Sequence, residues 1–164
     1  MRALRLLPLL ALLPLVAACD VTDQRAADVD VYTTEFAFRV SSAQLNSTGT
    51  VLSEQYDVPM LNRRVVDVGA VLCYFRENDT WTAMPYTYAV DRTDATAVDY
   101  AVSLGFAFED RFLEVFYEAS ATGVVGNQPD RRIKLVLIGP DLANKQNVDY
   151  SDYEAVKRAY GLKD

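Results

Sequence analysis

The sequence predicts a mainly β protein, an antiparallel β-sandwich of about seven strands with a short C-terminal α-helix. Large apolar residues recur at every second position from residue 31 onward, which is the period of a half-buried strand. Turn-forming residues interrupt this alternation roughly every 8–14 residues, as is typical of a sandwich. Helical spacing of apolar residues replaces the alternation only after residue 150.

We expect strands at 31–40, 50–58, 65–76, 81–90, 97–108, 111–119 and 131–138. The clearest alternation lies in 97–108, whereas 65–76 is apolar on both faces and therefore predicts a central strand. The segment 111–119 also fits a helix, but we favour a strand. Pro85 cannot donate a ladder hydrogen bond, so it marks its strand as an edge, a bulge or a bend.

A helix is predicted at residues 151–160. Ser151 and Glu154 have the spacing of a capping box, in which each side chain accepts a backbone N–H at the start of the helix. One helical face carries Tyr153, Val156 and Tyr160. Glu154 is also spaced to pair with Arg158, and Gly161 provides a C-terminal stop. We expect the Tyr/Val face to pack on the sandwich.

The first residues have the pattern of a bacterial lipoprotein signal peptide. Arg2 and Arg5 precede an apolar run over 6–16, which two prolines interrupt and which is shorter than the roughly 20 residues of a membrane span. The run ends in Val16-Ala17-Ala18-Cys19, which resembles a lipobox. We expect removal of residues 1–18 and attachment of lipid to Cys19; the alternative is cleavage nearby with Cys19 as an ordinary cysteine.

These signals divide the chain into a signal peptide over 1–18, a lipidated tether over 19–30 and a single domain over 31–164. Acyl chains on Cys19 would hold the protein on a membrane, since stable anchoring takes two or more chains. The expected location is the bacterial cell envelope. Asp20 does not decide between inner and outer membrane, because bacteria differ in how they read an acidic residue beside the lipidated cysteine.

Net charge disfavours nucleic acid as a partner. The whole chain has 16 basic and 23 acidic residues, a charge of −7. Removal of Arg2 and Arg5 with the signal peptide leaves 14 basic and 23 acidic residues, a charge of −9. Nucleic acids and anionic headgroups reward clustered Lys and Arg, which this chain lacks.

The absence of histidine excludes several chemistries. Ser-His-Asp and Cys-His catalysis and His-containing zinc sites all require a residue that this sequence does not have. Cys73 lies in an apolar run, and with Cys19 lipidated it has no cysteine partner, so we interpret it as a core residue. We expect no cofactor and no bound metal.

Acidic residues leave two alternatives open. The carboxylate pairs that could perform acid–base chemistry are Glu109/Asp110, Glu114/Glu118 and Asp91/Asp94. The polar residues that crowd one loop over 141–152 are Asp141, Asn144, Asn147, Asp149 and Asp152. Clustered oxygens suit hard cations, but the EF-hand spacing is absent. We interpret both groups as solvated surface, and the sequence does not decide whether the loop binds a cation.

Three aromatic residues are the candidate binding residues. Trp81, Tyr86 and Tyr88 lie in one predicted strand, where their rings could stack on sugars or contact a protein partner. By strand parity Tyr86 and Tyr88 share a face, and Trp81 is opposite unless Pro85 redirects the strand. The alternative is that all three serve core and edge packing.

A set of mainly apolar segments lies in a fixed order along the domain: Asp67–Tyr74, Trp81–Pro85, Tyr100, Arg132–Pro140 and Asp149–Gly161. The order of these segments resembles that of a group of small bacterial envelope lipoproteins with no assigned activity. The resemblance covers most of 31–161, and it implies the fold and the location without implying a catalytic residue. Some members have a collagen-like stalk after the lipidated cysteine. The stalk is absent here, which implies a domain close to the membrane.

Three functional hypotheses follow. The leading one is a membrane-anchored lipoprotein whose non-enzymatic domain binds or scaffolds another envelope component. The alternative is a carbohydrate-binding module that uses Trp81, Tyr86 and Tyr88 on an envelope glycan. The third, a carboxylate hydrolase, needs two buried carboxylates that face one cleft.

Overall fold

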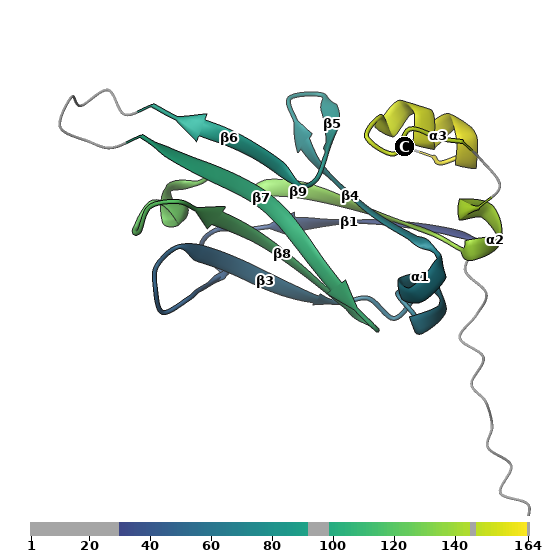
Figure 1. Cartoon of the computed structure of the whole chain (residues 1–164), viewed down its shortest axis with the longest axis horizontal. Coiled ribbons are helices and arrows are strands. Elements are labelled where there is room, and N and C mark those ends of the chain that lie inside the picture. The colour runs from purple at the N-terminus through teal and green to yellow at the C-terminus, as the bar shows by residue number, and fades with distance from the viewer. Residues whose placement is uncertain (1–29, 92–98, 145–146, 164) are drawn as a thin grey trace, which may run out of the picture.

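The computed structural model describes residues 30–91, 99–144 and 147–163, and it confirms a mainly β fold with a short C-terminal helix (Figure 1). The described elements are β1 (Val31–Phe38), β2 (Gln44–Leu45), β3 (Val51–Asp57), α1 (Arg63–Val68), β4 (Ala70–Glu77), β5 (Thr80–Ala83), β6 (Tyr86–Val90), β7 (Tyr100–Glu109), β8 (Phe112–Ala119), the 3₁₀ turn η1 (Val125–Asn127), β9 (Arg131–Ile138), α2 (Pro140–Ala143) and α3 (Tyr153–Tyr160). The predicted signal peptide over 1–18, Cys19 and residues 20–29 lie outside the described residues.

The strands form two antiparallel sheets. One has four strands in the order β1-β9-β4-β5, and the other has five in the order β2-β3-β8-β7-β6. Their facing sides bury one continuous core, whose fully buried members include Phe38, Leu104, Leu113, Tyr117 and Ile133. Alternation places these residues inward at every second position, which confirms the predicted β-sandwich.

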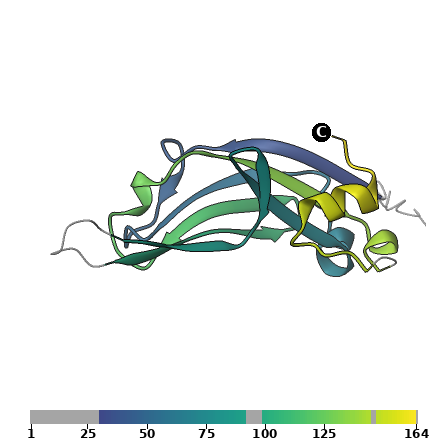
Figure 2. The same cartoon turned by 90° about the horizontal axis from the view of Figure 1, so that it is seen from above.

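The C-terminal helix forms a third layer on the four-stranded sheet. Tyr153 and Val156 of α3 are buried in a second apolar cluster with Tyr74, Val136 and Ile138, which lie on the side of that sheet facing away from the sandwich core. Figures 1 and 2 show α3 against this sheet, with α1 and α2 at one end of the molecule. The four-stranded sheet is therefore apolar on both faces, as expected for buried strands such as β9.

The predicted strand at 65–76 is wrong in its first part, where the chain forms α1. The Asn62 side chain accepts a hydrogen bond from the Val65 N–H at 3.1 Å and so caps the helix. Gly69 ends α1, and β4 begins one residue later. An unbroken apolar run does not distinguish a buried strand from a short buried helix by its period, so the polar cap was the informative residue.

The predicted strand at 81–90 is two strands in different sheets. β5 belongs to the four-stranded sheet and β6 to the five-stranded sheet, and the chain crosses between them at Met84-Pro85. Pro85 therefore marks a bend, one of the three expected outcomes. The segment 111–119 forms strand β8, as favoured. The predicted strand at 97–108 is described from Tyr100, since residues 92–98 lie outside the described residues.

The capping of α3 differs from the predicted box. Asp152, rather than Ser151, is the N-cap, and its Oδ1 accepts from the N–H groups of Glu154 and Ala155. Ser151 instead donates its hydroxyl to Asp149 at 2.7 Å. Arg158 lies 4.0 Å from Asp152, whereas its spacing in the sequence predicted an ion pair with Glu154. The helix ends as expected, at Gly161 in the left-handed conformation with φ of 65°.

Candidate functional site

One side of the sandwich is left open, and it defines the candidate site. We call this side the open face: the residues of the five-stranded sheet that point away from the core. Its members on the three longest strands are Val51, Ser53, Gln55 and Asp57 of β3, Phe112, Glu114, Phe116 and Glu118 of β8, and Ala101, Ser103, Gly105, Ala107 and Glu109 of β7. In the described part of the chain no α-helix lies over β3 or β8 (Figures 1 and 2).

The alternation of β8 fixes which residues reach the open face. Leu113, Val115 and Tyr117 are fully buried in the core, so the residues between them point outward. Phe112 is 46% exposed there, an unusual position for so large an apolar side chain.

The outward side chains of β7 are mostly small, so the surface of the open face is recessed along that strand. Ala101, Ser103, Gly105 and Ala107 occupy its outward positions, and the ring of Phe116 lies over Gly105. A Cβ at Gly105 would come within 2.6 Å of that ring, so glycine is what permits this close contact. The Phe116 ring thus fills the space over Gly105, and further along the strand Ala107 lines a hollow beside Phe112.

Two hollows adjoin on the open face. The first encloses about 290 Å³ and is lined by Gln55, Ala107, Phe108, Glu109, Phe112 and Glu114. The second encloses about 350 Å³ and is lined by Ser42, Gln44, Ser53, Glu54, Gln55 and Glu114. Because Gln55 and Glu114 line both, the two hollows adjoin, and we refer to them together as the groove, with an aromatic end and a polar end.

The groove is acidic. Among the outward carboxylates, Asp57 forms an ion pair with Arg111 at 3.4 Å. Within the described residues, Glu109, Glu114 and Glu118 take part in no ion pair. At the polar end Glu54 accepts a hydrogen bond from the Tyr56 hydroxyl at 2.8 Å; burial, together with this carboxylate, raises the pKa of Tyr56.

On the four-stranded sheet, a buried lysine contacts α3 and holds it against the outer side of the sheet. Lys134 on β9 has a side chain only 5% exposed, and its Nζ donates to the Tyr153 hydroxyl at 2.8 Å. The same Nζ lies 3.2 Å from Glu35 and 4.4 Å from the centre of the Trp81 ring. The cation is thus paired, hydrogen-bonded and stacked, which fastens α3 to the sheet and leaves no free polar atom for a ligand.

The structure does not bring the three predicted aromatic residues onto one surface. Trp81 lies on the four-stranded sheet, 5.9 Å from Tyr153 between ring centres, where α3 packs. Tyr86 and Tyr88 belong to the other sheet, with ring centres 6.0 Å apart. Tyr86 is 38% exposed, whereas Tyr88 is partly buried and donates its hydroxyl to Gln128 at 2.6 Å.

The predicted acidic candidates lie at separate places. Glu109 and Asp110 are exposed at the β7–β8 turn, Glu114 and Glu118 are on the open face, and Asp94 lies outside the described residues. No two of the described carboxylates in these pairs are buried together.

The polar loop over 141–152 uses its oxygens within the chain. Asp141 pairs with Arg64, Asp149 accepts from the hydroxyl and N–H of Ser151, and Asp152 caps α3. The Ser151 hydrogen bonds lower the pKa of Asp149.

The two asparagines of this loop are also placed away from any shared site. Asn147 is exposed, and the Asn144 amide donates to the Pro140 carbonyl. In residues 30–91, 99–144 and 147–163, no group of three or more His, Cys, Asp or Glu side chains is placed to hold a metal ion.

Cys73 is a core residue, as interpreted from the sequence. It is 2% exposed in the main apolar cluster, and burial raises the pKa of its thiol. A thiol in that environment stays protonated and is a poor nucleophile.

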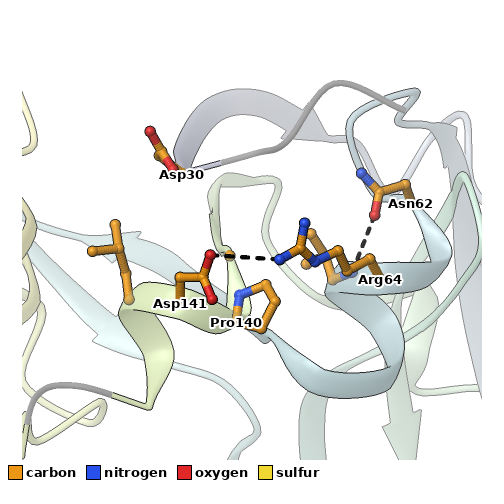
Figure 3. Close-up of a pocket in the computed structure, with 8 residues that line it drawn as sticks. Asp30, Asn62, Arg64, Pro140 and Asp141 are labelled. Atoms are coloured by element: carbon orange, nitrogen blue, oxygen red, sulfur yellow. Dashed lines mark hydrogen bonds and ion pairs between the residues drawn. The ribbon is translucent and has the colours of Figure 1, made fainter. Parts of the chain in front are cut away.

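A smaller polar pocket lies between α1 and α2 (Figure 3). It encloses about 60 Å³, room for a few waters, beside Asp30, Asn62, Arg64 and Asp141. Figure 3 shows Arg64 and Asp141 pointing toward each other, 3.5 Å apart, while Asn62 caps α1. The ion pair between Arg64 and Asp141 in this pocket therefore links α1 to α2, at the end of the molecule where β1 begins.

Comparison of the chain with protein-family models, with curated proteins and with solved structures found no match. The resemblance to small envelope lipoproteins stays an expectation from the sequence. In the described part of the chain, no helix is long and apolar enough to cross a membrane.

Sequence reasoning missed the open face as a site. The signal was present in 112–118, where Phe112, Glu114, Phe116 and Glu118 alternate with core residues. Large aromatic side chains at outward positions of a strand are the pattern that could have identified it.

Proposed function

We propose that the chain is a lipid-anchored, non-enzymatic binding domain of the bacterial envelope that holds a partner on its open face. One observation carries the proposal: α3 covers the outside of one sheet, while the outside of the other presents the groove with exposed Phe112. An aromatic side chain exposed in a hollow with a polar rim is a feature of protein interaction surfaces, where aromatic residues are enriched.

The lipobox-like sequence around Cys19 supports the anchored location. Mass spectrometry of the N-terminal peptide from the cellular protein tests it, with Cys19→Ala for comparison. We expect cleavage before Cys19, acyl chains on its thiol, and a shift of Cys19→Ala to the soluble fraction. An unmodified Cys19 in the cellular protein would remove the anchor from the proposal.

The absence of histidine and the separation of the carboxylates support a non-enzymatic role. Sustained turnover of any substrate by the purified protein, lost on substitution of Glu109 or Glu114, would contradict it.

Co-purification tests the open face itself. A tagged wild-type chain is compared with Phe112→Ser and with Val68→Ser, which removes an exposed apolar residue (56% exposed) on α1, at the end of the sandwich. We expect one discrete species that is recovered with wild type and Val68→Ser and is lost with Phe112→Ser. Equal recovery with all three chains would contradict binding at the open face.

The carbohydrate hypothesis now lacks a shared aromatic platform, because Trp81 is on a different sheet from Tyr86 and Tyr88. Trp81→Ala remains its direct test. Loss of glycan binding in a variant that stays folded would favour that hypothesis over ours.

A further inference from the structure

We infer that the partner segment seated on the open face is a short, extended, cationic stretch of polypeptide carrying at least one apolar side chain. This inference rests on the proposed function and deepens it by naming the chemistry of the occupant.

The charge of the groove is the first argument. None of the outward strand residues of the five-stranded sheet is Lys or Arg. The nearby cation, Arg111, is paired with Asp57. Glu114 lines both hollows and Glu118 lies on the same face of the same strand, so a partner with Lys or Arg side chains would meet complementary charge.

The aromatic end of the groove requires an apolar group as well. Phe112 is 46% exposed and lines the hollow of about 290 Å³. A purely charged ligand would leave this ring in water, whereas an apolar side chain placed against it would remove it from solvent.

The dimensions of the groove suit an extended segment. It crosses from the β2–β3 edge, at Ser42 and Gln44, to Ala107 on β7. Four neighbouring strands span roughly 15 Å at their usual spacing, which about five extended residues cover. Alternate side chains of such a segment point toward the sheet, so charged and apolar groups can reach the two ends in turn.

The test uses the full-length protein as purified from cells and three probes. One peptide alternates lysine with valine, a second alternates glutamate with valine, and the third probe is a neutral hexasaccharide of glucose. Affinity is measured by titration calorimetry at two salt concentrations for wild type and for Glu114→Gln/Glu118→Gln. The matched control is Asp67→Asn/Asp79→Asn, which changes net charge equally at exposed positions outside the open face.

We expect the lysine peptide to bind, to weaken about three- to tenfold in Glu114→Gln/Glu118→Gln and in high salt, and to be unchanged in the control. Comparable binding of the glutamate peptide, an equal loss in both double variants, or binding of the hexasaccharide alone would overturn the inference. Failure of the lysine peptide with persistent Phe112-dependent co-purification would overturn the cationic occupant while leaving the proposed function intact.

Discussion

Gly69 joins α1 to β4 where no side chain fits. A Cβ at this position would lie 2.6 Å from the Ile138 carbonyl oxygen and 2.8 Å from that of Val65. Both atoms belong to the backbone of packed elements, so neither can move away as a flexible side chain could. The glycine therefore allows the helix end to rest directly on β9.

Gly69→Ala is expected to lower the free energy of unfolding by about 1–3 kcal/mol, because the added methyl group forces the backbone apart. Gly126→Ala is the matched control, since a Cβ there meets nothing within 4 Å and the change should stay within about 0.5 kcal/mol. Urea unfolding of the two variants measures the difference. Equal stability of both would refute the close contact at Gly69.

At the scale of elements, α3 is held to the four-stranded sheet by one charged hydrogen bond and an apolar face. The buried Lys134 donates to Tyr153, and Trp81 stacks against the same cation. Elsewhere on the helix, Tyr160 shares a hydrogen bond at 3.1 Å with Tyr150. Tyr153 therefore hydrogen-bonds to a buried cation, whereas Tyr160 hydrogen-bonds to a neutral hydroxyl, and the first of these bonds is expected to be the stronger.

Tyr153→Phe is predicted to destabilise the protein by about 1.5–3 kcal/mol, because it removes a hydrogen bond to a buried charge. Tyr160→Phe deletes the same atom from a neutral, partly buried pair and should cost about 0.5–1 kcal/mol. Chemical denaturation with hydrogen exchange of α3 separates the two effects. A larger loss in Tyr160→Phe than in Tyr153→Phe would contradict the role assigned to Lys134.

Strands were predictable from alternation or from a short apolar run bounded by turn residues. β1 alternates and forms a strand as expected, β8 is the strand that was favoured over a helix, and β9, although apolar on both faces, has the expected bounds. The errors fall where the spacing of apolar residues does not distinguish the alternatives. α1 lies at the start of an apolar run that was predicted as a strand. Pro85 indicated a break without showing that the chain changes sheet. Asp152 rather than Ser151 is the cap. Both residue types are favoured at an N-cap, so the sequence alone does not choose between two adjacent candidates.

Across the whole molecule, the tyrosine hydroxyls make the fold sensitive to high pH. Burial raises the pKa of Tyr56 and Tyr74, and burial with the Tyr150 hydrogen bond raises the pKa of Tyr160 to about 12. A raised folded-state pKa contributes stability that is fully present below the ordinary value of 10.0 and is lost as pH rises through the raised value.

The protein is therefore expected to lose stability progressively above about pH 10. Tyrosinate absorbance and circular dichroism, followed together with increasing pH, check this. We expect part of the ten tyrosines to ionise only as the sandwich unfolds. Ionisation of all of them near pH 10 with an unchanged fold would contradict the buried environments.

The open face depends on how strands that are distant in the sequence pair with one another, which is why the sequence did not reveal it. Gln55 and Glu114 meet in the groove although 59 residues separate them in the chain. Their contact depends on the pairing of β3 with β8 in one register, and alternation predicts faces within a strand without predicting its neighbour. Trp81, Tyr86 and Tyr88 were grouped by closeness in sequence, which the change of sheet at Pro85 undoes.

The central claim is that the open face binds the partner, and photo-crosslinking in living cells tests it most directly. A photoreactive residue is placed at Gln55, which lines both hollows, and separately at Arg158 on the exposed side of α3. We predict a discrete cross-linked species from position 55 and none from position 158. A species from position 158 alone, or equal yields from both, would contradict the claim.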